Sequence, residues 1–254
     1  MIHFTGWDWA LMGVVTAMAS LLAWFRNPAW KAFMLSLPLP FTCATLSIGR
    51  GVEITNVVGL IVLLLFSLGV RILYYRFKLP LVPVIAGCAL GYCVLGGVLN
   101  RLLPRDKALF WIAAAVVFAI GVAAFRLSPV IPEPRYRSSL PFWIKVPIIA
   151  LVVVFLVAIK QQIGGFMTTF PMVTIIGVYE SRNSLYSSSR QIAFVVFGMA
   201  AMMAVVRAGQ VYFADRLPGL PGLGLALAAG WTVYLAQLAA LTRGRWALTV
   251  PIRE

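Results

Sequence analysis

Long apolar stretches recur along the whole sequence, and only short polar stretches separate them. A helix needs about 20 apolar residues to cross the ~30 Å hydrocarbon core of a membrane. On that criterion the sequence predicts an all-α integral membrane protein with about nine transmembrane helices. They cover residues 6–25, 30–48, 56–76, 80–100, 107–125, 143–162, 164–180, 189–209 and 219–242. The second and seventh segments are the shortest, and each is compatible with a full crossing or with a re-entrant loop.

The composition agrees with a membrane protein and argues against a soluble one. Hydrophobic residues make up 62% of the 254 residues and charged residues 11%, against about 25% charged in soluble domains. A net charge of +14 would suggest nucleic-acid binding in a soluble protein. No polar stretch here is long enough to form such a domain. We therefore expect the basic loops to contact membrane lipids, and we expect no nucleic acid.

The two short segments carry the same pattern. Residues 33–41 read FMLSLPLPF and residues 166–174 read FMTTFPMVT, so both contain Phe-Met-x-Ser/Thr-x-Pro. Aligning them places Pro38 on Pro171. Proline lacks a backbone N–H and clashes with the carbonyl four residues earlier. The pattern therefore predicts two broken helices at corresponding positions, helix two and helix seven.

The similarity extends beyond these segments. Each broken helix is followed by Glu-x-x-Asn, at 53–56 and at 180–183, and then by a long apolar helix. Helices one to four thus resemble helices six to nine, and helix five remains as a linker. The predicted organisation is a first repeat at 1–103, a linker helix at 104–126, a Pro-rich loop at 127–141 and a second repeat at 142–254.

The linker helix determines the relative orientation of the two repeats. Five crossings separate the start of one repeat from the start of the other, so the second repeat is inverted relative to the first. Many secondary transporters have inverted repeats, with a binding site between broken helices near the middle of the membrane. The alternative is that the match is coincidental and that the prolines only kink two membrane helices.

Each half resembles the GlpM-type family of very small bacterial membrane proteins. The resemblance rests on KAFMLSLPLPFTCATLS, with Ser36, Leu37, Pro38 and Leu39 matching the family's SLPL-like segment, and more loosely on 169–172. It implies a four-helix unit in each half and no particular chemistry. A fused, inverted pair of such units is similar to the duplication envisaged for dual-topology transporters such as the small multidrug resistance family.

The broken helices also suggest the binding residues. Carbonyls that a proline leaves without a donor must be satisfied by protein, water or ligand. Neighbouring hydroxyls can share that role. The predicted substrate site comprises Ser36, Pro38, Thr42, Thr169, Pro171 and Thr174. Freed carbonyls and hydroxyls suit a cation or a polar head group, whereas the N-terminus of a half-helix suits an anion.

Charged residues follow both broken helices. If the repeat is inverted, they lie on opposite faces of the membrane and form an outer and an inner gate. The predicted gate residues are Arg50, Glu53, Asn56, Glu180, Arg182 and Asn183, with Arg190 as a second possible partner of Glu180. The alternative is that these are ordinary charges on two surface loops.

Lys and Arg are distributed unevenly over the two sides that nine crossings define. Seven lie on the side of the N-terminus and fourteen on the other. Cytoplasmic loops carry the excess of Lys and Arg. We therefore expect the N-terminus outside and the C-terminus in the cytoplasm of a bacterial inner membrane. Arg135 and Arg137, in the longest loop, are then placed to contact lipid head groups or a partner protein, unless the loop is only a spacer.

Residues for enzymatic chemistry are scarce. The only histidine is His3, at a terminus, and the Cys and acidic residues show no metal-ligand spacing. No nucleotide-binding or nucleophile motif occurs. We expect no enzyme, no metal and no cofactor. The leading hypothesis is a small transporter or flippase-like carrier for an unknown small molecule or ion, and the alternative is a structural or regulatory subunit of a larger membrane complex.

Overall fold

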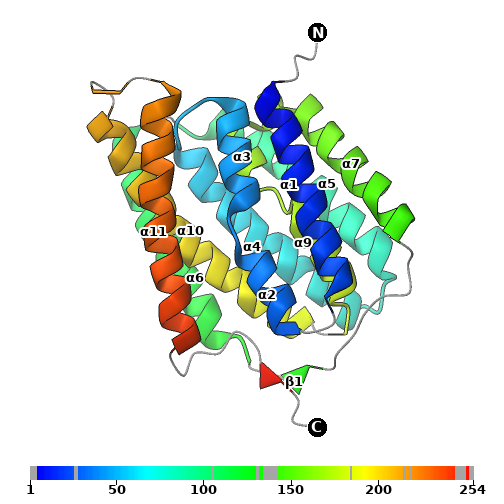
Figure 1. Ribbon diagram of the computed structural model, residues 1–254. Coiled ribbons are helices and arrows are strands. Elements are labelled where there is room, and N and C mark those ends of the chain that lie inside the picture. Colours follow the sequence, from blue (N-terminus) through cyan, green and yellow to red (C-terminus); the bar gives the residue numbers. More distant parts are fainter. Residues whose placement is uncertain are drawn as a thin grey trace.

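The computed structural model describes residues 5–25, 28–104, 106–129, 132–133, 142–183, 185–213, 216–217, 219–243 and 250–251. Nearly all of these residues are helical (Figure 1). The helices are α1 (Gly6–Trp24), α2 (Pro28–Ser36), α3 (Leu39–Ile48), α4 (Ile54–Tyr75), α5 (Leu81–Leu102), α6 (Lys107–Leu127), α7 (Phe142–Ala158), α8 (Lys160–Ile163), the 3-10 helix η1 (Gly164–Thr169), α9 (Met172–Glu180), α10 (Leu185–Phe213) and α11 (Leu220–Arg243). Two short strands, β1 (Pro132–Glu133) and β2 (Val250–Pro251), pair in parallel. The predicted loop residues Arg135 and Arg137 lie outside the described residues.

Several helices meet the length and hydropathy needed to cross a membrane. Five do so individually: α4, α5, α6, α10 and the Leu220–Leu241 part of α11. A sixth span arises if Ala150–Ala158 and Gln161–Thr169, which are bent by 63°, form one crossing. Gly6–Leu22 and Phe33–Ile48 are apolar but shorter. The protein is therefore a multi-span helical membrane protein, and nine full crossings stay a prediction.

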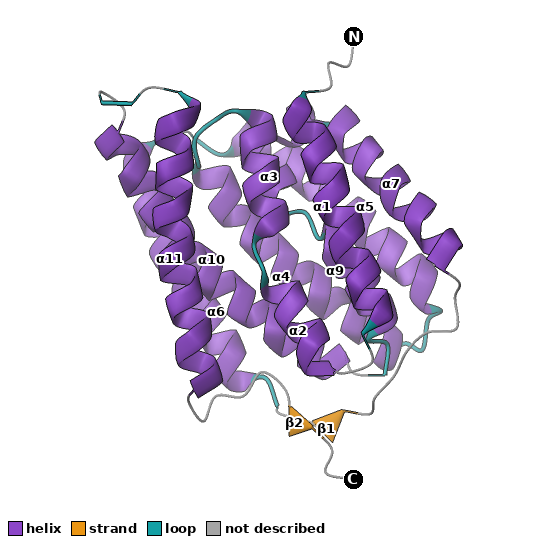
Figure 2. Ribbon diagram, in the orientation of Figure 1, coloured by secondary structure: helices purple, strands orange, loops and turns teal. Residues whose placement is uncertain are grey.

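Both predicted helix breaks are present among the described residues. Figure 2 shows each one as a loop inside the helical bundle, between α2 and α3 and between η1 and α9. Pro38 is the N-cap of α3, and Pro171 is the N-cap of α9. Each new helix begins after a residue without an N–H, because a continuous helix through that residue would lose a hydrogen bond and clash.

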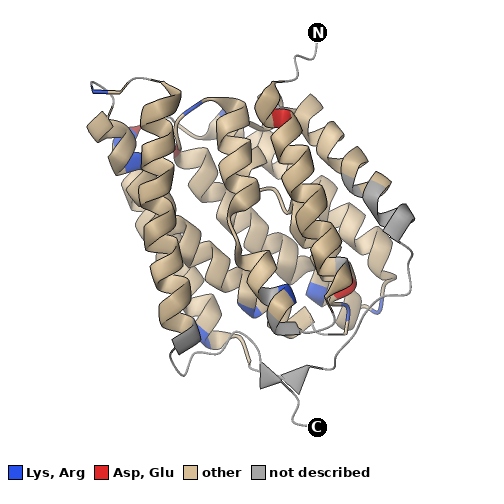
Figure 3. Cartoon of the chain, in the orientation of Figure 1, with Lys and Arg blue, Asp and Glu red and all other residues tan. Residues whose placement is uncertain are grey.

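The charged residues lie where a protein that crosses a membrane should have them. Figure 3 shows the described Lys, Arg, Asp and Glu near the two ends of the bundle, while the zone between them is built of other residues. An ion in hydrocarbon is costly, so charged residues gather where water or head groups reach them. The two ends of the bundle thus mark the two faces of the protein.

Helix α10 packs against α11, α6, α4 and α2. Gly121 of α6 permits this packing, since an added Cβ would lie 2.7 Å from the Phe197 nitrogen of α10. Gly230 of α11 similarly approaches Met202 and Val206 of α10. Such contacts between small residues bring helix backbones together in membranes. Through them α10 connects the linker helix to both halves of the chain.

Candidate functional site

The two helix breaks face one another across a single cavity. This inner cavity has a volume of about 70 Å³. Its lining includes Ser36 and Pro38 from the first break, and Thr169, Pro171 and Thr174 from the second. Five of the six predicted site residues are thus brought together, although 133 or more positions of sequence separate Ser36 from the residues of the second break. Among the described residues that line it, none is charged.

The sixth predicted residue, Thr42, does not line this cavity. Its hydroxyl donates to the Pro38 carbonyl at 3.1 Å and accepts from Trp231 Nε1 at 2.8 Å. Thr42 therefore satisfies a carbonyl at the break and joins α3 to α11. Thr42 lies one helical turn beyond Pro38, and its hydroxyl is engaged by these two partners. Its predicted role in substrate binding stays a prediction.

Two buried tyrosines hold the breaks, and each comes from the other half of the chain. Tyr92 of α5 donates to the Phe166 carbonyl at 2.9 Å and shares a 2.8 Å hydrogen bond with Thr169 Oγ1. Tyr234 of α11 donates to the Ser36 carbonyl. The sequence interpretation missed both residues. The available signal was a tyrosine inside the last helix of each half, since a buried Tyr hydroxyl normally requires a partner.

Two amides repeat this reciprocal arrangement. Asn56 of α4 donates to Thr168 Oγ1 at 2.8 Å and to the Gly165 carbonyl at 3.3 Å. Gln191 of α10 donates to the Ser36 hydroxyl at 3.2 Å. Each long helix that follows a break therefore contacts the break of the opposite half. Asn56 was a predicted gate residue, whereas Gln191 was not.

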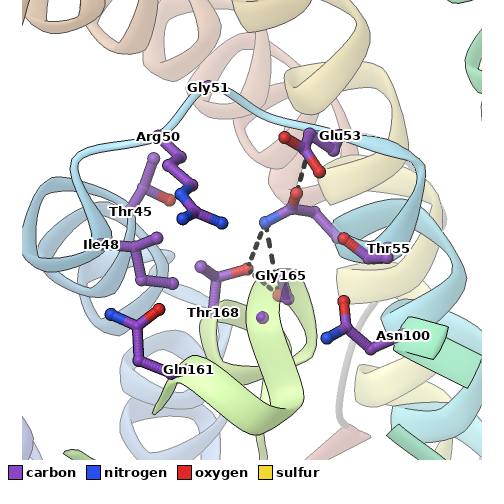
Figure 4. Close-up of a pocket in the computed structure, with 12 residues that line it drawn as sticks. Thr45, Ile48, Arg50, Gly51, Glu53, Thr55, Asn100, Gln161, Gly165 and Thr168 are labelled. Atoms are coloured by element: carbon purple, nitrogen blue, oxygen red, sulfur yellow. Dashed lines mark hydrogen bonds between the residues drawn. The ribbon is translucent and has the colours of Figure 1, made fainter. Parts of the chain in front are cut away.

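A second cavity opens toward the face at which α3 ends and α4 begins. This outer cavity has a volume of about 40 Å³, and its lining combines the 49–53 connection with α5 and the start of η1 (Figure 4). Arg50, Glu53 and Asn56 line it, so the three residues of the predicted outer gate lie together. Thr168 lines both the outer and the inner cavity.

Two adjacent glycines shape the floor of the outer cavity. Gly164 has a φ of +52°, which favours glycine. An added Cβ on Gly165 would lie 2.8 Å from Asn56 Oδ1 and would overlap the Thr55 hydroxyl. Only a residue without a side chain lets η1 approach the start of α4 this closely, and this approach brings Thr168 to Asn56.

The three predicted inner-gate residues lie near one another in the chain but have different environments. Glu180 is buried, and its main-chain oxygen accepts a hydrogen bond from Lys31 Nζ at 3.3 Å. The Arg182 carbonyl accepts from Tyr75 of α4 at 3.2 Å, and Asn183 is exposed. Lys31 was not among the predicted gate residues.

Arg190 has a different partner from the predicted one. Its Nη1 donates to the Phe125 carbonyl at 2.9 Å and to the Ser128 carbonyl at 2.7 Å, and its guanidinium lies 4.0 Å from the Phe125 ring centroid. These carbonyls belong to the C-terminal end of α6, where a cation is favourable. Arg190 therefore caps the linker helix. Its described hydrogen bonds go to α6, whereas the sequence had offered it as a second possible partner of Glu180.

The ends of α4 and α10 also reach across to the opposite half. Near the end of α10, Gln210 accepts from the Val52 nitrogen at 3.1 Å, and Arg207 donates to the Val52 carbonyl at 3.4 Å. Near the end of α4, Arg71 lies 5.1 Å from the ring centroid of Tyr186 in α10. Each arginine thus stands beside the connection that follows the other half's break.

The described residues contain no cluster of His, Cys, Asp or Glu that can hold a metal ion. Cys43, Cys88 and Cys93 are free thiols. The chemistry available at the two cavities is therefore hydrogen bonding by hydroxyls, amides and carbonyls, together with the charges of Arg50 and Glu53.

No protein-family model matches the sequence, and neither the curated proteins nor the solved structures contain a match. The resemblance of each half to the GlpM-type family consequently stays a prediction. The interpretation of the site rests on the geometry described above.

Proposed function

We propose that the protein is a small membrane transporter, or flippase-like carrier, that works by alternating access around its two broken helices. The observation that supports this most directly is the inner cavity, because both breaks line it. Irregular backbone inside a membrane is tolerated where it is buried in protein or lines a cavity. Two such segments facing one another are the arrangement around which secondary transporters bind their substrates.

In this proposal residues 1–103 and 142–254 are inverted repeats on either side of α6. The reciprocal contacts favour that relationship: Tyr92 binds the second break, and Tyr234 binds the first. Asn56 and Gln191 likewise bind the break of the opposite half. Contacts that recur with the halves exchanged are expected when a pseudo-two-fold axis relates the halves.

In the conformation seen here both cavities are small, and both are lined by Thr168. The inner cavity of about 70 Å³ is small, and the Asn56–Thr168 hydrogen bond lies where the two cavities adjoin. Rocking one half against the other would exchange the hydrogen bonds at one break for contacts with solute or water. Net hydrogen-bond energies between membrane helices are about 0.6 kcal/mol on average, so such exchanges are accessible thermally.

The two ends of the pathway differ in this proposal. Arg50, Glu53 and Asn56 form the outer gate, on the side where α1 begins. Glu180, with Lys31 beside it, forms the inner gate on the cytoplasmic side of a bacterial inner membrane. Arg182 and Asn183 follow on the same connection. With no nucleotide site in the sequence, an ion gradient or a partner would drive uphill transport.

Alternating access can be tested before the solute is known. A variant without native cysteines would carry Thr174→Cys, because Thr174 lines the inner cavity and is not among the described hydrogen-bond partners of Tyr92 and Tyr234. In vesicles of either orientation, a membrane-impermeant maleimide should label this cysteine from both sides. Val94→Cys is the control. Val94 is 65% exposed on α5 and is expected to face lipid, so this cysteine should stay unlabelled from both sides.

Proline substitutions then separate gating from folding. Pro38→Ala or Pro171→Ala should lower labelling from one side about tenfold, the effect of a ~1.4 kcal/mol change between two states. The unfolding temperature should change little.

In reconstituted vesicles loaded with a mixture of metabolites, the same variants should slow solute loss. Unchanged labelling and flux in both variants would contradict the transporter proposal and favour a structural or regulatory subunit. Labelling of Thr174→Cys from one side only would do the same.

A further inference from the structure

Arg50 places a positive charge in the outer cavity without a protein partner. In Figure 4 its guanidinium points into the cavity, toward Thr168 and Gly165. Within the part of the chain that the structure describes, it makes no hydrogen bond, ion pair or ring contact. Arginine carries five N–H donors in a planar fork that matches a carboxylate or phosphate. The donors of Arg50 are therefore available to a ligand.

Glu53 is the negatively charged residue that lines the same cavity, and the start of α4 engages it. Glu53 and Asn56 form a capping box, in which the Glu53 carboxylate accepts from the Asn56 main chain and the Glu53 N–H donates to Asn56 Oδ1 at 2.7 Å. The N-terminus of a helix stabilises a carboxylate. Glu53 thus serves the helix end, which leaves Arg50 as the charge directed at the cavity.

The rest of the lining is neutral and polar. It includes the side-chain amides of Asn100 and Gln161 and the hydroxyls of Thr45 and Thr55. One water-sized group needs ~10–15 Å³, so a cavity of about 40 Å³ holds roughly three such groups. That is the size of a carboxylate, or of the oxygens of a phosphate, and is far too small for a whole lipid.

We infer that the outer cavity binds the anionic group of the transported molecule, a carboxylate or a phosphate, through Arg50. The inference rests on the proposed function for its place on a pathway, because Thr168 joins this cavity to the inner one. The anionic group belongs either to a free solute or to the head group of a phospholipid. Both present the same oxygens to the guanidinium.

Binding is measured on the full chain in an uncharged detergent. Inorganic phosphate and acetate are titrated calorimetrically at constant ionic strength, with chloride as the replaced anion. Arg50→Gln should weaken oxyanion binding about tenfold or more, as expected for loss of a charge-assisted contact. Arg50→Lys should weaken it less, because the charge remains and the fork is lost. Arg101→Gln is the matched control, an exposed arginine at the end of α5 that does not line the cavity, and should bind like wild type.

A second arm distinguishes the two sources of the anion. Native mass spectrometry of protein extracted from membranes would show retained anionic phospholipid in wild type and in Arg101→Gln, but not in Arg50→Gln, if a lipid head group is the ligand. Phosphate or acetate binding that requires Arg50, in a protein that retains no anionic phospholipid, supports a free solute. The absence of both signals, or equal signals in wild type and Arg50→Gln, overturns the anion site.

The binding result and the transport result are separable. Arg50-dependent anion binding in a protein that fails the Thr174→Cys labelling test would support the site and reject the transporter. Labelling from both sides that responds to Pro38→Ala, in a protein that binds no anion, would reject the site and leave the transporter standing.

Discussion

The Tyr234 hydroxyl of α11 donates to the main-chain carbonyl of Ser36, 198 positions earlier in the sequence. Ser36 is the last residue of α2, where Pro38 prevents the helix from continuing. A carbonyl at such an end has no intrahelical donor, and an unsatisfied polar group in a membrane core is costly. Tyr234 thus supplies the donor that makes the first break tolerable, as Tyr92 does for the second.

Removing either hydroxyl should destabilise the protein without altering its packing. Tyr92→Phe and Tyr234→Phe should each lower the free energy of unfolding by about 1 kcal/mol or more, because each removes a buried hydrogen bond to a main-chain carbonyl. Tyr212→Phe is the control, because Tyr212 is 60% exposed. Unfolding in a denaturing detergent would measure all three. Equal stabilities of the three variants would contradict the role assigned to the buried pair.

Gly165→Ala should separate η1 from α4. Its Cβ would lie 2.8 Å from Asn56 Oδ1, and overpacking of this kind typically costs about 1–3 kcal/mol. Gly97→Ala in α5 has no atom within 4 Å of the added Cβ, so its stability should equal or slightly exceed that of wild type. Thermal unfolding of the two variants in the same detergent tests the comparison, and similar losses in both would refute it.

Asn56→Ala should loosen the outer gate. The variant loses the 2.8 Å hydrogen bond to Thr168, worth about 1 kcal/mol, so labelling of Thr174→Cys from the outer side should speed up severalfold. Thr45→Ala also changes a residue of the outer cavity, but its hydroxyl bonds only within its own helix, to the Phe41 carbonyl, among the described contacts. The rate at which Thr174→Cys is labelled should therefore be the same with and without Thr45→Ala. Faster labelling in both variants would indicate that the protein is loosened in general, and would contradict a gating role for the Asn56–Thr168 hydrogen bond.

Arg190→Gln should destabilise the junction between α10 and α6. Arg190 is 6% exposed, and its guanidinium bonds two carbonyls at the end of α6. Hydrogen bonds from a charged group contribute about 1.5–3 kcal/mol. Arg76→Gln, which changes an exposed arginine after α4, should have an effect within about 0.5 kcal/mol. A stable Arg190→Gln protein with altered labelling would instead return this residue to the gate.

The linker helix should cross the membrane once. Lys107→Cys and Pro129→Cys flank α6 (Lys107–Leu127), and in a background without native cysteines they should react with an impermeant maleimide from opposite sides. We expect the first to react from the outer side and the second from the cytoplasmic side. Reaction of both from one side would exclude an inverted relation between the halves.

The positions of the helix breaks and the placement of the chain in a membrane could both be predicted from the sequence. Both properties are local: a proline lacks an N–H wherever it stands, and a run of apolar side chains favours hydrocarbon whatever its neighbours are. For this reason the helix breaks at Pro38 and Pro171 were predicted correctly. The number of full crossings stays a prediction, because α1 and the α2–α3 segment are short.

The groups that satisfy the carbonyls at the breaks could not be predicted from the sequence, because they come from distant helices that the fold brings together. Tyr92 and Thr169 are 77 positions apart, and Gln191 and Ser36 are 155 apart. No local pattern links such pairs, because their contact depends on how helices cross and rotate in the packed bundle. The same packing turned Thr42 toward Trp231 and Arg190 toward the end of α6. It also directed the guanidinium of Arg50 into the outer cavity, whereas the sequence predicted Arg50 only as a gate residue beside Glu53.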